Sequence, residues 1–97
     1  MADYELRYED ECLRDLRGVA RAYDLPLITK AVLDLARQAE TITRNQRRLR
    51  VPITWCPAAT WQRRVGGYRI LYRVDDGIVS VLRVRFKGSK TTEEMGP

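Results

Sequence analysis

The chain contains no histidine, and that absence excludes several common kinds of active site. Without an imidazole there is no Ser-His-Asp triad, no Cys-His pair and no zinc site of mixed cysteine and histidine ligands. Cysteine occurs only as Cys12 and Cys56, which is too few for a four-cysteine zinc site. We therefore expect no metal and no cofactor, and any catalysis would have to use arginine, lysine, tyrosine, aspartate or glutamate.

Long apolar runs are also missing. Residues 1–10 are polar and the longest segment with a helical pattern is amphipathic, so neither a signal peptide nor a membrane span is expected. The sequence predicts a cytoplasmic protein with no membrane partner. In a reducing cytosol, Cys12 and Cys56 are expected to be packing residues rather than a disulfide.

What the chain has in excess is positive charge. Its 97 residues, which we expect to form one domain spanning 1–97, include 18 lysines and arginines against 13 aspartates and glutamates, a net charge of +5. A polyanion or an acidic protein is the natural partner of such a chain. Arginine far outnumbers lysine, which suits bidentate contacts with phosphate but is also typical of a GC-rich genome.

The first half of the sequence predicts a strand followed by a helical hairpin. Residues 4–9 alternate between apolar and charged side chains, as a half-buried strand does. Apolar residues at helical spacing then predict one helix from about 10 to 23, ended by Pro26, and a second from about 27 to 46. The basic run 44–50 would be either the solvated end of the second helix or a binding arm.

The second half predicts an antiparallel meander. Residues 51–60 contain two prolines and lack periodicity, so we expect a loop in which Trp55 covers the core. Gly66-Gly67 and Asp76-Gly77 are two-residue turn pairs, and they delimit three strands at 61–65, 68–75 and 78–87. The expected fold class is therefore α+β, with a short N-terminal strand, a helical hairpin and an antiparallel three-stranded meander.

Two-residue turns also fix which residues face each other. One face of the meander is then apolar and is expected to pack on the helices, with Trp61, Val65, Tyr68, Ile70, Tyr72, Val74, Val79 and Val81. The other is expected to be a binding face, with Gln62, Arg64, Arg69, Leu71, Arg73, Ser80, Leu82 and Val84. In this register Leu71 lies opposite Leu82 and Arg69 opposite Val84. Arg83 and Arg85 fall on the core face, unless a bulge turns them over.

The same register places Arg64 directly opposite Arg69. A like-charge pair is unfavourable on a sheet unless an anion lies between the two side chains or both extend into water. A phosphate or a partner's carboxylate would resolve the repulsion, so the pair indicates an anion-binding surface.

Residues 67–75, GYRILYRVD, followed by residues 78–84, IVSVLRV, resemble the RelE/ParE superfamily of toxins. Length, basic charge and element order agree with this resemblance. It implies the toxin of a bacterial type II toxin–antitoxin module, which a cognate antitoxin neutralises. Its target would be either mRNA on the ribosome, cleaved by a metal-independent endoribonuclease activity, or DNA gyrase.

The resemblance also implies roles for single residues. Arg69 matches the family's central-strand arginine, whose role would be to stabilise charge on the scissile phosphate. The last-strand cation would be Arg85 or Lys87, which makes these three the catalytic candidates. The candidates for RNA or anion binding are Arg63, Arg64, Arg73 and Arg83. The lysine pair that RelE-like nucleases carry before this hairpin is absent, as is their C-terminal tyrosine, since residues 88–97 contain no aromatic.

Three functions therefore remain open from the sequence. The first is a toxin that binds and cleaves mRNA and so inhibits growth. The second is a non-enzymatic inhibitor of DNA gyrase, with Leu71, Leu82 and Val84 as its contact surface. The third is a catalytically inactive nucleic-acid-binding relative.

Overall fold

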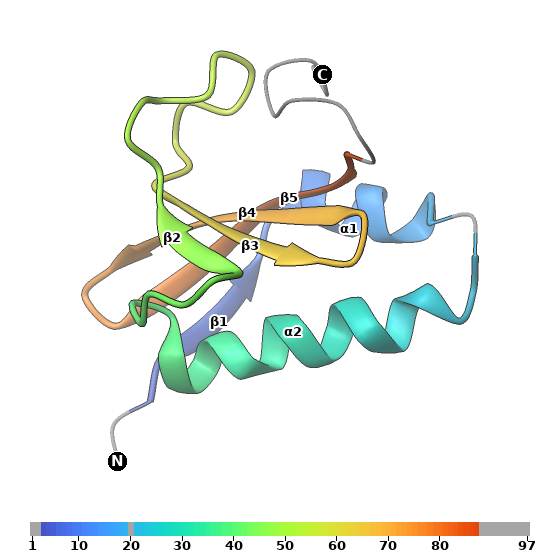
Figure 1. Cartoon of the computed structure of the whole chain (residues 1–97), viewed down its shortest axis with the longest axis horizontal. Coiled ribbons are helices and arrows are strands. Elements are labelled where there is room, and N and C mark those ends of the chain that lie inside the picture. The colour runs from blue at the N-terminus through green and yellow to red at the C-terminus, as the bar shows by residue number, and fades with distance from the viewer. Residues whose placement is uncertain (1–2, 20, 88–97) are drawn as a thin grey trace.

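The structure is a computed structural model, which describes residues 3–19 and 21–87. It contains two helices and five strands: β1 (Glu5–Tyr8), α1 (Asp10–Arg17), α2 (Asp24–Gln38), β2 (Gln46–Arg48), β3 (Trp61–Val65), β4 (Tyr68–Asp75) and β5 (Ile78–Phe86). The strands form one sheet in the order β1-β5-β4-β3-β2, in which β1 runs parallel to β5 and all other neighbours are antiparallel. The expected α+β class is confirmed. The helices lie against one face of the sheet, and the long β2–β3 loop lies beyond the other (Figure 1).

The helical hairpin is present, but its boundaries differ from those predicted. α1 ends at Arg17, where the Gly18 N–H bonds back to two carbonyl oxygens of the last turn, so the expected extension to residue 23 is wrong. α2 begins at Asp24, so Pro26 lies in its first turn instead of ending the preceding helix. Proline is tolerated there because backbone N–H groups of the first turn have no partner within the helix.

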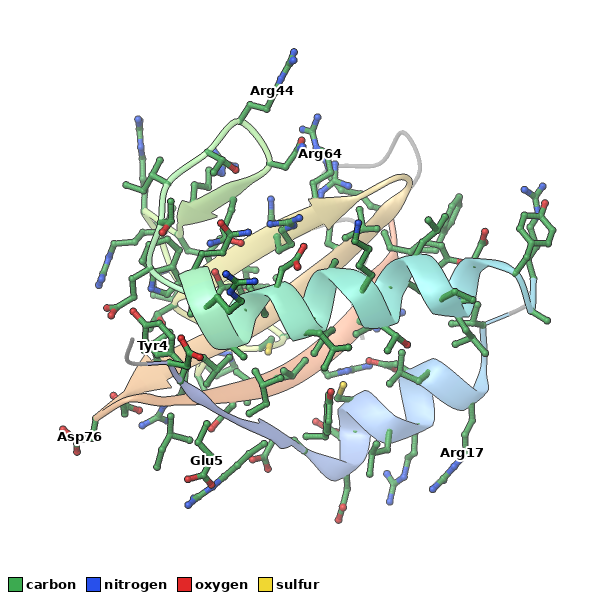
Figure 2. All side chains as sticks on the ribbon, turned by 90° about the horizontal axis from the view of Figure 1, so that it is seen from below. Tyr4, Glu5, Arg17, Arg44, Arg64 and Asp76 are labelled. Carbon is green, nitrogen blue, oxygen red and sulfur yellow. The ribbon has the colours of Figure 1, made fainter. Side chains whose placement is uncertain are left out.

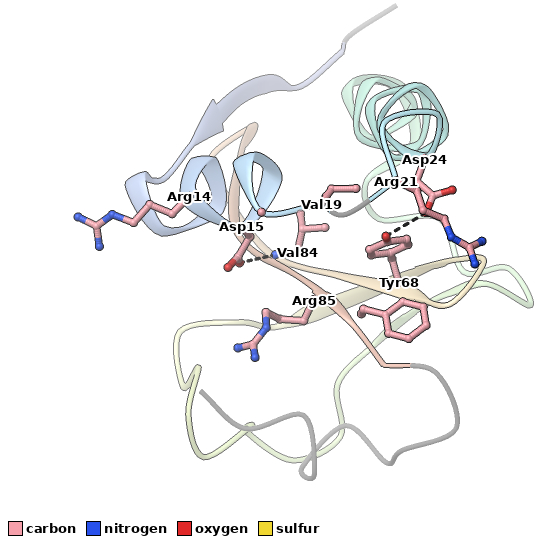
Figure 3. Close-up of a pocket in the computed structure, with 10 residues that line it drawn as sticks. Arg14, Asp15, Val19, Arg21, Asp24, Tyr68, Val84 and Arg85 are labelled. Atoms are coloured by element: carbon pink, nitrogen blue, oxygen red, sulfur yellow. Dashed lines mark hydrogen bonds between the residues drawn. The ribbon is translucent and has the colours of Figure 1, made fainter.

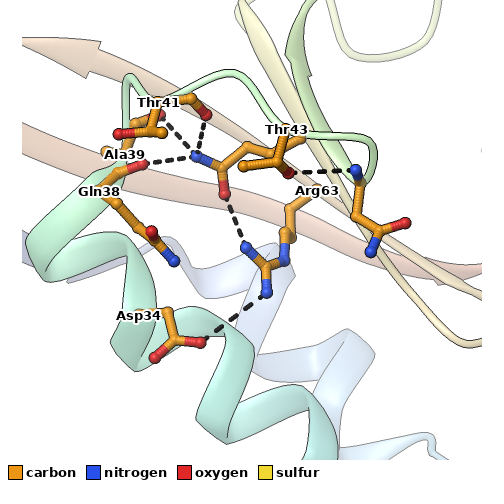
Figure 4. A network of polar contacts seen from close by, with 8 residues as sticks. Asp34, Gln38, Ala39, Thr41, Thr43 and Arg63 are labelled. Atoms are coloured by element: carbon orange, nitrogen blue, oxygen red, sulfur yellow. Dashed lines mark hydrogen bonds and ion pairs between the residues drawn. The ribbon is translucent and has the colours of Figure 1, made fainter.

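The C-terminal end of α2 is also earlier than predicted, at Gln38 rather than 46. Gln46 instead opens β2, and its buried side chain closes the end of the helix (Figure 4). Its Nε2 donates to the carbonyl oxygens of Gln38 at 2.6 Å and Thr41 at 2.8 Å, while its Oε1 accepts from Arg63 Nη1 at 3.0 Å. Residues 44–50 therefore form an edge strand and its flanking residues instead of the end of the helix. The helix ends earlier because the side chain of Gln46 bonds to carbonyl groups at its C-terminal end.

The main core lies between α2 and the sheet. One stripe of α2 is buried, with Ile28, Ala31, Val32 and Leu35, and it packs on Trp61, Ile70, Tyr72, Val79, Val81 and Val84. Tyr72 is fully buried, and its hydroxyl donates to the Ala39 carbonyl oxygen at 2.7 Å. This bond satisfies a polar atom that burial would otherwise leave unpaired.

A second apolar cluster covers part of the other face of the sheet. Leu71 is fully buried there under Ile53, Cys56 and Ala59 of the β2–β3 loop, with Leu49, Trp55 and Leu82 packed around them. The expectation that Trp55 covers a core is confirmed. The prediction that Leu71, Leu82 and Val84 form an exposed apolar patch is wrong, because the loop buries Leu71 and Val84 belongs to the main core.

Both cysteines are free and buried, as predicted, Cys12 in the main core and Cys56 in the second cluster. No helix among the described residues is long and apolar enough to cross a membrane.

We expect Gln46→Leu to lower the free energy of unfolding by about 2–4 kcal/mol, because it leaves helix carbonyls and Arg63 without their partner. Urea denaturation checks this. Arg44→Leu, at an exposed position two residues earlier, is the control and should change stability by less than about 0.5 kcal/mol. Equal stability of the two variants would contradict the capping role of Gln46.

The Cys12 thiol gives a second prediction. Burial, with a smaller contribution from Asp15, raises its pKa to about 12. In the unfolded chain the thiol loses its proton near pH 8.5, well before the folded chain does, so stability should fall as the pH rises above about 8.5. Cys12→Ala should flatten this fall in denaturation series between pH 7 and 10; an unchanged slope would contradict the assignment.

Candidate functional site

The two hairpins of the sheet differ in how well the predicted register holds. Across the first turn it is confirmed, with Arg64 opposite Arg69. Across the second it holds from Asp75 to Tyr72, which pairs with Val81, and then shifts by one residue. Leu71 pairs with Arg83 and Arg69 with Arg85, so the expected pairs of Leu71 with Leu82 and of Arg69 with Val84 are wrong.

The shift is a β-bulge in which Leu82 is the extra residue of β5. Beyond it every side chain of β5 changes face. Val84 turns into the main core, where it is 3% exposed, and Arg85 leaves the core face for the opposite one. Arg64, Arg69 and Arg85 thereby lie side by side on β3, β4 and β5. We call these three residues the arginine row.

Arg69, at the centre of the row, is 5% exposed. Its Nη1 donates to the Tyr68 carbonyl oxygen at 3.1 Å, whereas its buried Nε has no hydrogen-bond partner within the described part of the chain. Burial lowers the pKa of Arg69, and so do the neighbouring charges of Arg64 and Arg47. Within residues 3–19 and 21–87, Arg47, Arg64 and Arg69 form no ion pair. Among the described residues, the centre of the row is thus a buried cation with a spare donor and no counter-charge, which makes it a site where an anion can bind.

Arg85 is held by an aromatic contact that sequence analysis missed. Its guanidinium carbon lies 5.3 Å from the centre of the Trp55 ring, and that of Arg83 lies 5.4 Å from the same centre. Such cation–π contacts orient a guanidinium without neutralising it. Trp55 comes from the β2–β3 loop, so this loop positions part of the row as well as covering the sheet.

Arg83 is engaged in a structural ion pair. Its Nε and Nη2 donate to the Asp15 carboxylate of α1 at 2.8 and 3.3 Å, and the Val84 backbone N–H donates to the same carboxylate at 2.9 Å. Asp15 raises the pKa of Arg83. These bonds attach α1 to β5. Arg83 therefore has a structural role and is not part of the arginine row, although it is close to it.

The remaining candidates lie at different distances from the row. Arg63 points to the helix side, where it bonds Gln46 and lies 3.8 Å from the Asp34 carboxylate. Arg73 is exposed, pairs with the Asp75 carboxylate and belongs to the end of the sheet near Asp76, opposite to the end that carries Arg64 (Figure 2). Lys87 follows β5 directly, and its backbone N–H donates to the Gly67 carbonyl oxygen at 2.7 Å. The structure therefore brings Arg69, Arg85 and Lys87 to one end of the sheet and separates Arg63 and Arg73 from them.

No group of three or more cysteine, aspartate or glutamate side chains within the described ranges could hold a metal ion. The chemistry available at the row is that of guanidinium groups: binding of phosphate or carboxylate and stabilisation of negative charge.

Comparison with known proteins identifies a family and solved structures that the chain resembles. Residues 6–88 match the family described as ParE toxin of the type II toxin–antitoxin system parDE. Among solved structures, the chain is similar to one in the toxin–antitoxin complex RelBE2 from Mycobacterium tuberculosis, with 32% sequence identity, a TM-score of 0.68 and coverage of 84% of this chain and 95% of that chain. No curated protein matches the sequence.

A second solved structure, the archaeal RelE-RelB complex from Pyrococcus horikoshii OT3, shares the fold. Its TM-score is also 0.68, at 16% identity, over 92% of this chain and 99% of that chain.

We expect Arg69→Leu to raise the free energy of unfolding by about 1 kcal/mol at low ionic strength, because it removes a buried, uncompensated charge. Added sulfate should stabilise the wild type and have little effect on the variant, since an anion that binds only the folded state stabilises it. Thermal denaturation with and without sulfate checks both effects. Arg73→Leu is the control, and equal stabilisation of wild type and Arg69→Leu by sulfate would contradict an anion site at Arg69.

Proposed function

This chain belongs to the RelE/ParE superfamily of toxins from type II toxin–antitoxin systems, and we propose that it arrests growth by binding and cleaving mRNA through the arginine row. The observation that carries the proposal is the state of Arg69, a buried arginine that forms no ion pair with any residue the structure describes and that is flanked by two further arginines. RNA offers an anion of the required kind at every nucleotide.

The geometry of the row suits an extended phosphate backbone. Adjacent strands lie about 4.8 Å apart, so the backbones that carry Arg64 and Arg85 are separated by roughly 10 Å, with Arg69 between them. Arginines on neighbouring strands can contact one phosphate together or two successive phosphates. Arg47, whose charge also acts on Arg69, extends the positive surface to β2.

The chemistry that we propose is attack of a ribose 2′-hydroxyl on the adjacent phosphate. Negative charge develops on the phosphoryl oxygens as the new bond forms, and Arg69 and Arg85 would stabilise it. Arginine is a poor general base because its pKa lies far above neutrality, so the hydroxyl proton must pass to another group. Lys87, at the same end of the sheet, is a cation at neutral pH, so we assign it to protonation of the 5′ oxygen that leaves as the P–O5′ bond breaks, while the 2′-hydroxyl proton passes to solvent.

No observation favours gyrase inhibition through the patch considered from the sequence, because the β2–β3 loop and the main core bury Leu71 and Val84. Inhibition of gyrase supercoiling by the purified chain would contradict the proposal. Binding of RNA with a steep salt dependence but without cleavage would place the chain among inactive relatives.

Arg69→Ala should relieve growth arrest on expression and slow the cleavage of ribosome-bound mRNA by about 10²- to 10³-fold, as the removal of one charge-stabilising donor typically does. Arg85→Ala should act in the same direction. Arg73→Ala, which removes an arginine of the same strand that Asp75 already neutralises, should leave both measurements close to wild type.

Intact mRNA in cells arrested by the wild-type chain would overturn the cleavage step. RNA binding then separates the two halves of the proposal: Arg69→Ala should weaken it and reduce the dependence of log K on log salt by about one phosphate contact. Unchanged binding would remove the row from the RNA interface.

A further inference from the structure

A hollow of about 550 Å³ lies at the same end of the sheet as the arginine row, between the end of α1, the start of α2 and the last residues of β5 (Figure 3). We call it the Phe86 hollow; the side chains that line it include Arg14, Arg21, Tyr68, Arg85 and Phe86. Arg85 belongs both to this hollow and to the arginine row. A ligand that follows the row across the sheet therefore reaches the hollow at Arg85.

Phe86 is the last residue of β5 and is 66% exposed. Its ring meets the Tyr68 ring edge to face, with 5.3 Å between the ring centres, and the Tyr68 hydroxyl is held in turn by the Asp24 carboxylate of α2 at 3.0 Å. The turn before β4 is equally close, since a Cβ on Gly67 would lie 2.5 Å from the Phe86 Cε1. Phe86 thus presents an aromatic ring that packs against Tyr68 and Gly67 and is otherwise open to solvent.

The surroundings of the ring are positively charged. Arg14 and Arg21 line the hollow, and within residues 3–19 and 21–87 neither forms an ion pair. The two aspartates of the hollow are engaged, Asp15 with β5 and Asp24 with the Tyr68 hydroxyl. The hollow therefore combines an exposed aromatic ring with a positive potential that attracts an anionic ligand.

Single-stranded RNA carries the two groups that this combination suits, an anionic phosphate and a flat aromatic base in every nucleotide. Proteins bind such strands with cations along the backbone and with aromatic rings on which unpaired bases stack. Successive side chains of a strand point to opposite faces, so Arg85 lies on the face of the row and Phe86 on the other. A nucleotide at the end of β5 can therefore place its phosphate on Arg85 and its base on the Phe86 ring.

We propose that the Phe86 ring stacks on one base of the RNA whose phosphates the arginine row binds, and so determines which nucleotide lies at the row. Arg69 and Arg85 contact charge that every nucleotide carries, so they do not distinguish one base from another. A stacking ring does, because a purine offers a larger surface than a pyrimidine. This inference rests on the proposed binding of RNA by the row, and it predicts a preference for a purine at the stacked position.

The test measures the dissociation constants of three short single strands with equal numbers of phosphates: 2′-O-methyl oligo(A), 2′-O-methyl oligo(U) and an abasic oligomer. None of them has a free 2′-hydroxyl, so the proposed attack cannot cleave them. The wild-type chain should bind oligo(A) most tightly and the abasic oligomer least tightly, because only a base can stack on Phe86.

Phe86→Leu should weaken the binding of oligo(A) at least about fivefold and change the affinity for the abasic oligomer by less than about twofold, as the loss of one base–aromatic stack does. Phe86→Trp restores a ring and should keep the wild-type preference for oligo(A). Gly67→Ala displaces the ring without removing it and should also weaken oligo(A). Leu33→Ala is the control, since Leu33 is 55% exposed on α2 and does not line the hollow; its affinities should match the wild type.

A spectroscopic measurement detects the stack directly. One 2-aminopurine in an otherwise abasic oligomer is fluorescent when free, because it has no neighbouring base, and stacking on an aromatic ring quenches it. Binding to the wild-type chain should quench this fluorescence, and binding to Phe86→Leu should leave most of it. Thermal denaturation of each variant shows whether it is folded at the temperature of the titration.

Equal affinity of the wild type and Phe86→Leu for oligo(A), or fluorescence that neither protein quenches, would overturn the inference. So would an equal loss of affinity for oligo(A) and for the abasic oligomer, because Phe86 would then support the position of the cations instead of contacting a base. Unchanged RNA affinity together with weaker binding of a protein partner would assign the ring to a protein interface and would also overturn it.

The proposed cleavage and the proposed stacking fail separately. If the wild-type chain leaves ribosome-bound mRNA intact but Phe86→Leu loses the preference for oligo(A), only the cleavage is wrong. If Arg69→Ala relieves growth arrest and slows cleavage but Phe86→Leu binds oligo(A) like the wild type, only the stacking is wrong.

Discussion

One extra residue in β5 decides which side chains meet on the functional face of this protein. Without the bulge at Leu82, Val84 would lie opposite Arg69, and Arg85 would point into the core that α2 covers. Burial of an unpaired guanidinium in an apolar core is far less favourable than burial of valine. The bulge is therefore stabilised because it places Val84, instead of Arg85, in the core. Because Val84 is buried in the core, the next residue, Arg85, lies on the opposite face of the sheet and pairs with Arg69.

The bulge also connects the sheet to α1. Immediately after Leu82, Arg83 and the Val84 N–H both bond to the Asp15 carboxylate, so an aspartate of the helix satisfies the part of β5 that β1 does not pair. This attachment holds the end of α1 beside β5, where Asp15, Val84 and Arg85 line one hollow. The register shift thus forms the arginine row, and the residues directly after it attach β5 to α1.

The face of the sheet that carries the arginine row combines a well-packed region with a buried charge that is unfavourable for stability. The β2–β3 loop buries Leu71 and places Trp55 against Arg83 and Arg85, which makes this side of the sheet a packed support. On that support Arg69 is buried, and no described residue supplies it with a counter-charge. Local instability of this kind is expected where a protein is built to receive a charged ligand, because the ligand supplies the missing interaction.

The sequence by itself determined what depends on neighbours along the chain. The two turn pairs and the alternation between them gave the hairpins, the opposition of Arg64 and Arg69 and the superfamily resemblance, and the lack of histidine restricted the chemistry to charged groups such as arginine. Only the tertiary structure decided the rest, since it depends on contacts between residues far apart in the chain. Gln46 ends α2 and opens an edge strand because its amide reaches the helix carbonyls, and the bulge exchanges Val84 and Arg85 because α1 and α2 cover one face and not the other. Period-two patterns cannot reveal a shift of one residue, because every side chain beyond the shift still alternates.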